Sequence, residues 1–147
     1  MQENIHDSGI YEISVNGRSP IRIKNMITNA GLAAMAKAAA GLGSMRIKYL
    51  AIGSSSTAVS ASQIKLVAET ARFPVAAGSS SGAVATTVFN ILSGEGIGQI
   101  EELGIFVGDD ATNEADSGTL LSRVLWSHDK SSSEEITITR TDTFGRA

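Results

Sequence analysis

Residues 24–43, KNMITNAGLAAMAKAAAGLG, carry the strongest helical pattern in a chain that otherwise alternates like a series of β-strands. Thr28 or Asn29 can cap this helix by accepting a hydrogen bond from a free backbone N–H. Gly41 or Gly43 can end it in a left-handed turn. The sequence therefore predicts an α-helix over about residues 28–41.

The surface of this helix is apolar almost all round. Leu32, Met35, Ala36 and Ala39 have the i, i+3, i+4, i+7 spacing of one helix face, and further alanines occupy the other sides. Lys37 is the one charged side chain in its interior. Because such a helix is usually buried, we expect it to pack on a β-sheet and on neighbouring copies of the chain. A charge at position 36 is then expected to destabilise the fold.

The rest of the chain has the two-residue alternation of β-strands. Residues 11–15 and 21–24 flank the turn-rich segment 16–20, which predicts a β-hairpin. One helix with seven to nine strands predicts a mainly β fold, an antiparallel sandwich or barrel with the helix packed on it. Residues 58–71 have an ambiguous pattern, in which 62–70 are compatible with a short helix. The other predicted elements are strands over 46–52, 73–77, 83–91, 100–107, 119–126 and 134–144, the last two forming a pair.

Length and composition limit the kinds of site and partner that the chain can have. The 147 residues suit a flexible N-terminal arm over 1–9 and one β-sandwich domain over 10–147. There are 0 cysteines, so disulfides and thiolate metal sites are excluded. The net charge of −3 and the absence of a dense basic run argue against nucleic acid as a partner. No apolar run reaches the roughly 18 residues that span a bilayer, so no membrane partner is expected.

A G-x-S-x-G motif at residues 78–82 is the first candidate for catalysis. In hydrolases with this motif the serine, here Ser80, lies on a turn between a strand and a helix. The residues that follow have a strand pattern, and His6 and His128 are the two histidines that could complete a triad. We therefore interpret 78–82 as a flexible hairpin tip.

Three further polar or glycine-rich motifs are interpreted as parts of turns and loops, without a catalytic or binding role. His128 and Asp129 suggest a catalytic dyad or a metal site, but neighbours at a strand end point in opposite directions and one histidine supplies one ligand. We therefore expect them in a solvated turn between the last two strands. The acidic run 109–116 lacks the residue order of a calcium loop and is expected to be an exposed loop. Glycines 94, 96 and 98 do not form the G-x-G-x-x-G motif of nucleotide sites.

Glu101 and Glu102 are a possible acid and base pair. As neighbours on a strand they face opposite sides of a sheet, so they are expected to serve in a structural ion pair with Arg72 or Arg123. The sequence thus predicts no catalytic residue, no cofactor and no metal ligand.

Apolar strands supply the remaining packing candidates. Val88, Phe106 and Trp126 join the four helix residues as expected core or subunit contacts. The last strand has a ladder of threonines on one face, which we interpret as solvated, with a subunit contact as the alternative. These threonines are Thr137, Thr139, Thr141 and Thr143.

Several segments together resemble a widespread group of small bacteriophage virion proteins. Those proteins are usually labelled tail-fibre or collar-fibre proteins, and similar small proteins decorate capsids. The resemblance covers roughly residues 21–144. The matching segments are the helix start ITNAGL (27–32), the strand IKYLAIG (47–53), Leu66 with Glu69 and Arg72, the strand ELGIF (102–106) and the strand GTLLSR (118–123).

This resemblance implies a non-enzymatic virion protein, assembled in the host cytoplasm. It implies a homo-oligomer, in particular a trimer, that contacts the major capsid protein or tail components. The few residues after Phe144 favour capsid decoration or cement, or a compact tail or fibre-attachment component, over a full fibre. The alternative is a host-surface or carbohydrate-binding tail-fibre module, which would need an exposed aromatic platform such as Trp126.

Overall fold

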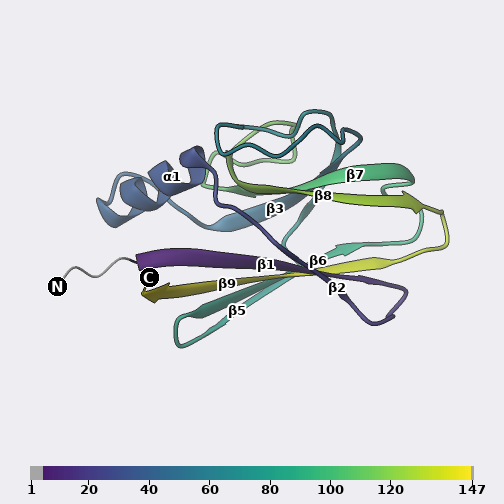
Figure 1. Cartoon of the computed structure of the whole chain (residues 1–147), viewed down its shortest axis with the longest axis horizontal. Helices are drawn as coiled ribbons and strands as arrows, with labels where there is room; N and C mark the ends of the chain where they lie inside the picture. The colour runs from purple at the N-terminus through teal and green to yellow at the C-terminus, as the bar shows by residue number, and fades with distance from the viewer. Residues whose placement is uncertain (1–4, 147) are drawn as a thin grey trace.

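In residues 5–146, which are those that the structure describes, nine strands form two antiparallel sheets stacked face to face (Figure 1). The structure is a computed structural model of the whole chain. A single helix in this part of the chain lies at one end of the stack, beside the chain termini. The predicted mainly β fold with one packed helix is confirmed, as a sandwich and not a closed barrel.

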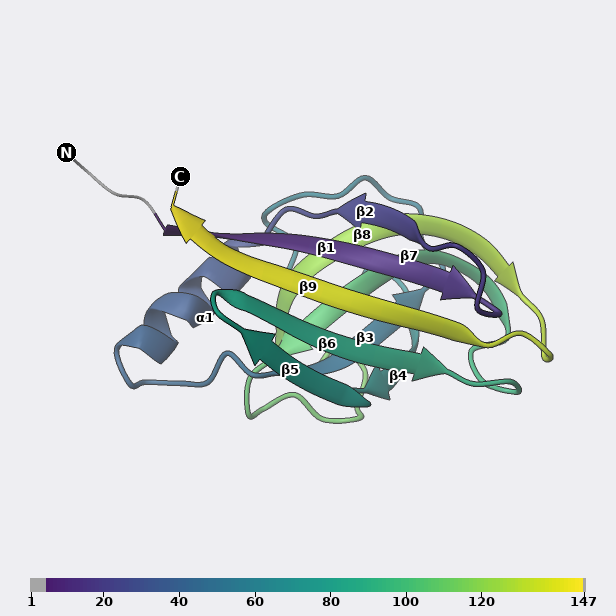
Figure 2. The same cartoon turned by 90° about the horizontal axis from the view of Figure 1, so that it is seen from below.

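Each sheet joins two pairs of consecutive strands through strands that are distant in the sequence (Figure 2). The five-stranded sheet has the order β2 (Ile21–Lys24), β1 (Ile5–Val15), β9 (Ile136–Arg146), β6 (Val84–Ile91) and β5 (Ala77–Ser81). The four-stranded sheet has the order β4 (Glu69–Pro74), β3 (Ile47–Gly53), β7 (Gly98–Val107) and β8 (Thr119–Lys130). The helix is α1 (Asn29–Ala39).

Three sequence predictions about these elements are corrected. The segment 62–70 contains no helix, and strand β4 begins there at Glu69. Strands β8 and β9 do not pair, because the short connection between them crosses from one sheet to the other. The arm was expected to extend to residue 9, but Ile5 to Gly9 pair with β9 as part of β1. Residues 1–4 of that arm lie outside the described residues.

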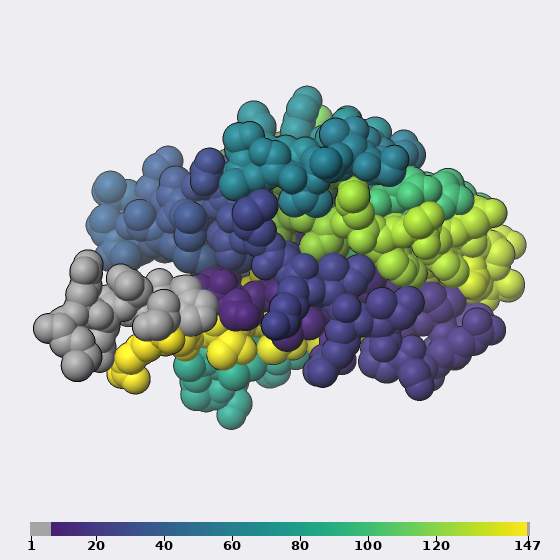
Figure 3. Space-filling model, in the orientation of Figure 1, coloured from purple at the N-terminus to yellow at the C-terminus, as the bar shows by residue number. Residues whose placement is uncertain are grey.

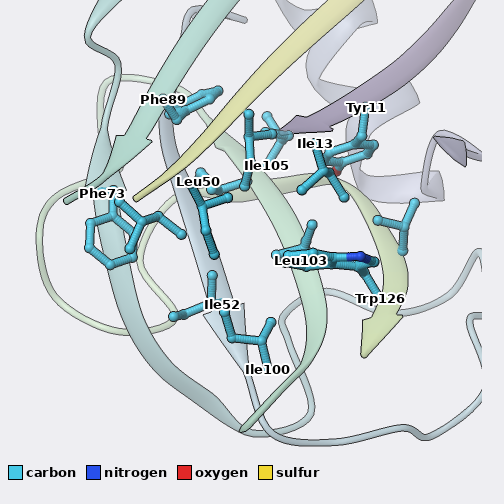
Figure 4. Close-up of a cluster of buried hydrophobic side chains, with 14 of the residues drawn as sticks. Tyr11, Ile13, Leu50, Ile52, Phe73, Phe89, Ile100, Leu103, Ile105 and Trp126 are labelled. Atoms are coloured by element: carbon cyan, nitrogen blue, oxygen red, sulfur yellow. The ribbon is translucent and has the colours of Figure 1, made fainter. Parts of the chain in front are cut away.

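The main core fills the space between the sheets (Figure 4). Alternate residues of each strand point into this layer, as the period of two requires. A smaller core lies on the outer face of the four-stranded sheet, where Leu66 and Ala111 from two long loops pack on Phe106 and Leu120. The buried residues of the main core include Tyr11, Ile13, Leu50, Ile52, Phe89, Leu103, Ile105, Trp126 and Ile138.

The ends of α1 are those that the sequence predicts. The hydroxyl of Thr28 accepts a hydrogen bond of 2.9 Å from the backbone N–H of Gly31, which is a helix N-cap. After the helix, Gly41 has a φ of 74°, in the left-handed region that favours glycine. The Thr28 hydroxyl also donates to the carbonyl of Leu120, so the cap ties the helix start to β8.

Three of the four residues on the predicted packing face of α1 do not pack on the sheets of the single chain. Leu32 is 53% exposed, and Ala36 and Ala39 are exposed too. The covered side carries the buried Gly31 and the half-buried Met35. A Cβ at Gly31 would lie 3.0 Å from a methyl of Leu121, so the first turn packs closely on β8. The remainder of α1 projects past the end of the sandwich (Figure 3).

Candidate functional site

The inner face of the five-stranded sheet changes from apolar to charged along its length. On β9, Ile136 and Ile138 point into the core, and the next two residues on the same face are Arg140 and Asp142. Arg140 is fully buried, and Asp142 is 2% exposed. The charged half of this face lies at the end of the sandwich that carries α1 and the chain termini (Figure 1).

Arg140 is held by groups from three strands and a connecting segment. Its Nη2 donates to Asp142 Oδ1 at 2.7 Å, and its Nε donates to Oδ2 at 3.0 Å. Its Nη1 donates to Ser122 Oγ of β8 at 3.0 Å and to Asn25 Oδ1. The guanidinium carbon lies 4.9 Å from the centre of the Tyr11 ring, which is a cation–π contact. These five residues and Asp7 form what we call the Arg140 cluster.

A glycine makes room for this arrangement. Gly9 pairs with Asp142 across the two strands, and a Cβ at Gly9 would lie 2.1 Å from Arg140 Nη2. Any side chain at position 9 would therefore displace the guanidinium from its carboxylate partner.

Asp7 is the member of the Arg140 cluster whose side chain lacks hydrogen-bond partners. Both of its carboxylate oxygens are inaccessible to solvent and lack a hydrogen-bond partner. Burial, and after it the neighbouring Asp142, raise the pKa of Asp7 to about 7, while Arg140 acts in the opposite direction. A proton on Asp7 leaves one carboxylate facing one guanidinium, which makes the cluster neutral.

The raised pKa of Asp7 predicts a stability that falls with pH. The folded chain binds this proton more tightly than the unfolded chain, whose aspartate pKa is near 3.8. The contribution is complete below pH 3.8 and is lost as the pH rises to about 7. Above pH 7, Asp7→Asn is expected to raise the free energy of unfolding by roughly 2 kcal/mol, because the residue is only half-buried and solvent screens part of the penalty.

Urea unfolding at pH 5 and at pH 8 measures this effect. The gain from Asp7→Asn should be larger at pH 8 than at pH 5, and Asp129→Asn on the exposed side of β8 should show no such difference. An equal effect of Asp7→Asn at both pH values would contradict the assignment.

A cleft of about 610 Å³ opens between the sheets beside the Arg140 cluster. Asp142 and Thr87 lie on its five-stranded side, and Arg46 and Lys48 lie on its other side. Its remaining lining residues are Met45, Ile47, Tyr49, Pro74, Val75, Gly78, Ala85 and Phe144.

A second buried ion pair lies under the loop 54–68. Glu102 and Arg123 are both buried, with 3.4 Å between Glu102 Oε1 and Arg123 Nε. Glu102 also accepts hydrogen bonds from the backbone N–H groups of Ser55 and Val67, at 3.0 and 2.7 Å. The predicted structural role of Glu102 with Arg123 is confirmed, and the pair fastens this loop to the four-stranded sheet.

Two of the polar motifs have different positions from those expected. Residues 78–82 are not a hairpin tip, because Ala77–Ser81 is the edge strand β5 and the turn comes at Gly82. His128 lies in β8 and not in a turn; its ring stacks on Trp126 at 5.0 Å and contacts Glu134 at 3.2 Å. Ser80 and His128 therefore belong to different sheets.

The acidic run 109–116 lies in an exposed loop, as the sequence predicts. Arg72 fastens this loop by donating to the carbonyls of Thr112 and Ser117 at 2.9 and 3.1 Å. Among residues 5–146, no three His, Cys, Asp or Glu side chains are placed to hold a metal ion. Within the same residues no helix has the length and apolar character to cross a bilayer.

The predicted packing residues of the strands divide between core and surface. Phe106 and Trp126 are buried in the two cores, so core packing is confirmed for both. Val88 is half-buried, on the opposite face of β6 from the core residue Phe89. Trp126 is 9% exposed and therefore provides no aromatic platform for a sugar. The threonine ladder of β9 is exposed or half-exposed, on the outer face of its sheet.

The sequence analysis does not predict the Arg140 cluster, although the alternation of residues in β9 indicates part of it. Arg140 and Asp142 are in phase with Ile136 and Ile138, so the alternation of β9 assigns both charges to the core face. Their partners Asn25 and Ser122 lie more than a dozen residues away along the chain, and no local pattern connects them.

Comparison with known proteins found no relative of this chain. No protein-family model matches the chain, and no curated protein or solved structure is significantly similar to it. The function therefore has to be inferred from the residues and their arrangement.

Proposed function

We propose that this protein is a non-enzymatic structural subunit of a bacteriophage particle. It forms a homo-oligomer on the outside of the particle, as a capsid decoration or cement protein or as a compact tail or fibre-attachment component. The sequence resemblance described above supports the class of protein. The exposed apolar side of α1 is the observation that carries the proposal.

In a monomer, that side of α1 leaves apolar side chains in contact with water, which is unfavourable in free energy. Leu32 is 53% exposed and Leu42, just after the helix, is 77% exposed. Exposed alanines at positions 33, 36 and 39 surround them, with Lys37 as the charged exception. Burying a leucine side chain stabilises a protein by roughly 1.5–3 kcal/mol, so an interface between copies would gain from covering this side. Small alanine side chains would let a second backbone approach closely.

The structure changes what Ala36→Glu is expected to do. Since Ala36 is exposed in the single chain, the substitution should change the free energy of unfolding of the monomer by less than about 0.5 kcal/mol. In the proposed oligomer the same carboxylate would be buried without a partner, so self-association should weaken by at least about tenfold. Static light scattering over a range of concentrations measures the association.

Ala115→Glu is the matched control, because Ala115 is an exposed alanine outside α1. It should leave both association and stability unchanged. A wild-type chain that stays monomeric at micromolar concentration would contradict the oligomer. Localisation by immunoelectron microscopy of purified phage particles tests the virion assignment separately, and particles without the protein would contradict it.

A further inference from the structure

The cleft beside the Arg140 cluster has the chemical features of a ligand site. Buried polar side chains normally have hydrogen-bond partners. In the described part of the chain, four buried side-chain atoms lack one, and all belong to residues around Arg140. They are Asp7 Oδ1, Asp7 Oδ2, Asn25 Nδ2 and Thr87 Oγ1.

One of these groups, the hydroxyl of Thr87, belongs to a residue that lines the cleft. Thr87 is the cross-strand partner of Arg140 on β6, and it lines the cleft with its hydroxyl buried and unpartnered. Asp142 also lines the cleft, and Arg140 holds its carboxylate in a fixed orientation. A carboxylate oxygen has lone pairs beyond those that Arg140 uses. This side of the cleft therefore offers one acceptor group and one hydroxyl.

The opposite side of the cleft is cationic. Arg46 and Lys48 line it from the start of β3, and within residues 5–146 neither forms an ion pair. Val75 and Phe144 add apolar surface to the lining of the cleft. The volume of about 610 Å³ lies within the roughly 300–1,000 Å³ typical of small-molecule sites.

We propose that this cleft binds a small hydroxylated anion, such as a sugar acid or a sugar phosphate. A ligand hydroxyl can donate to Asp142 and accept from Thr87 at the same time, whereas an aliphatic group could do neither. The anionic group faces Arg46 and Lys48, away from the Asp142 carboxylate. An ammonium ligand is disfavoured because these two cations would repel it. The C–H face of a sugar ring packs on Val75 and Phe144.

Titration of the ¹⁵N-labelled chain by NMR tests this proposal, with D-glucuronate as the probe. Saturable shifts of the Val75, Ala85 and Thr87 amide resonances are expected. Neutral glucose, which keeps the hydroxyls, and acetate, which keeps the charge, should each bind at least about tenfold more weakly. Glucose 6-phosphate in place of glucuronate distinguishes a phosphate ligand from a carboxylate, and saturable binding of either anion supports the site.

Two variants separate the two sides of the cleft. Lys48→Met should reduce the affinity for glucuronate to about that for glucose, whereas Lys65→Met, outside the cleft, should not change it. Thr87→Val should weaken glucuronate and glucose alike, while its melting temperature stays at or above that of the wild type because an unpartnered hydroxyl is removed. Absence of saturable shifts, acetate binding as strong as glucuronate binding, or equal affinities in Lys48→Met and wild type would overturn the proposal. The outcome is independent of the oligomeric state proposed above.

Discussion

Replacing Arg140 with methionine is expected to lower the free energy of unfolding by roughly 3–5 kcal/mol. Methionine fills much of the same space, so the loss comes mainly from charge and not from a cavity. It would leave Asp142 buried with no cation beside it, and it would remove the hydrogen bonds to Ser122 and Asn25. Urea unfolding at pH 7 measures the difference.

An exposed ion pair on the same sheet provides the control. Arg22 donates to Glu12 at 2.9 Å with 70% of its side chain exposed, so Arg22→Met should cost less than about 1 kcal/mol. Adding Asp142→Leu to Arg140→Met should recover part of the loss, because it removes the unpaired buried charge. A cost of Arg140→Met as small as that of Arg22→Met would mean that water reaches the cluster.

Removing the Glu102 side chain is expected to cost a similar amount, roughly 3–5 kcal/mol, in the variant Glu102→Ala. Arg123 would then be buried without its carboxylate partner. The N–H groups of Ser55, Val67 and Ala68 would also lose their acceptor. Besides the loss of stability, we expect faster hydrogen exchange at these amides, since Glu102 fastens the loop 54–68.

Glu101→Ala is the matched control on the adjacent residue. Glu101 lies at a bulge in the pairing of β7 with β8, and it accepts hydrogen bonds from Gln99 and Ser127 near the surface. Its removal should change the free energy of unfolding by about 0.5 kcal/mol or less and should leave the loop amides protected. Similar costs for Glu101→Ala and Glu102→Ala would show that burial of the pair is unimportant.

The two buried ion pairs stabilise different parts of the sandwich. The Glu102–Arg123 pair supports a surface loop on the outer face of the four-stranded sheet. The Arg140 cluster lies between the sheets, links β1 and β9 to β8, and borders the proposed ligand cleft. Arg140→Met and Glu102→Ala therefore test different parts of the molecule.

Local sequence patterns were sufficient to predict most of the individual helices and strands. The ends of α1 depend on Thr28 and Gly41, whose effects operate within a few residues. Each is one of the two residues that the sequence predicts for its end of the helix. The core positions of Phe106 and Trp126 follow from strands with little polar character. For Glu101 and Glu102 the sequence predicts a structural ion pair with Arg72 or Arg123, and the tertiary structure selects the pair of Glu102 with Arg123.

What the sequence by itself determined was the fold class, the ends of the helix and the alternation of each strand, since these depend on neighbours along the chain. The predicted hairpin of β1 and β2 is confirmed. Tertiary structure alone decided which strands pair beyond hairpins, which side of α1 is covered and where the charges of β9 find partners. The last two strands follow each other in sequence yet belong to different sheets. Strand pairing and burial depend on contacts between residues far apart in the chain, and a local pattern contains no information about those contacts.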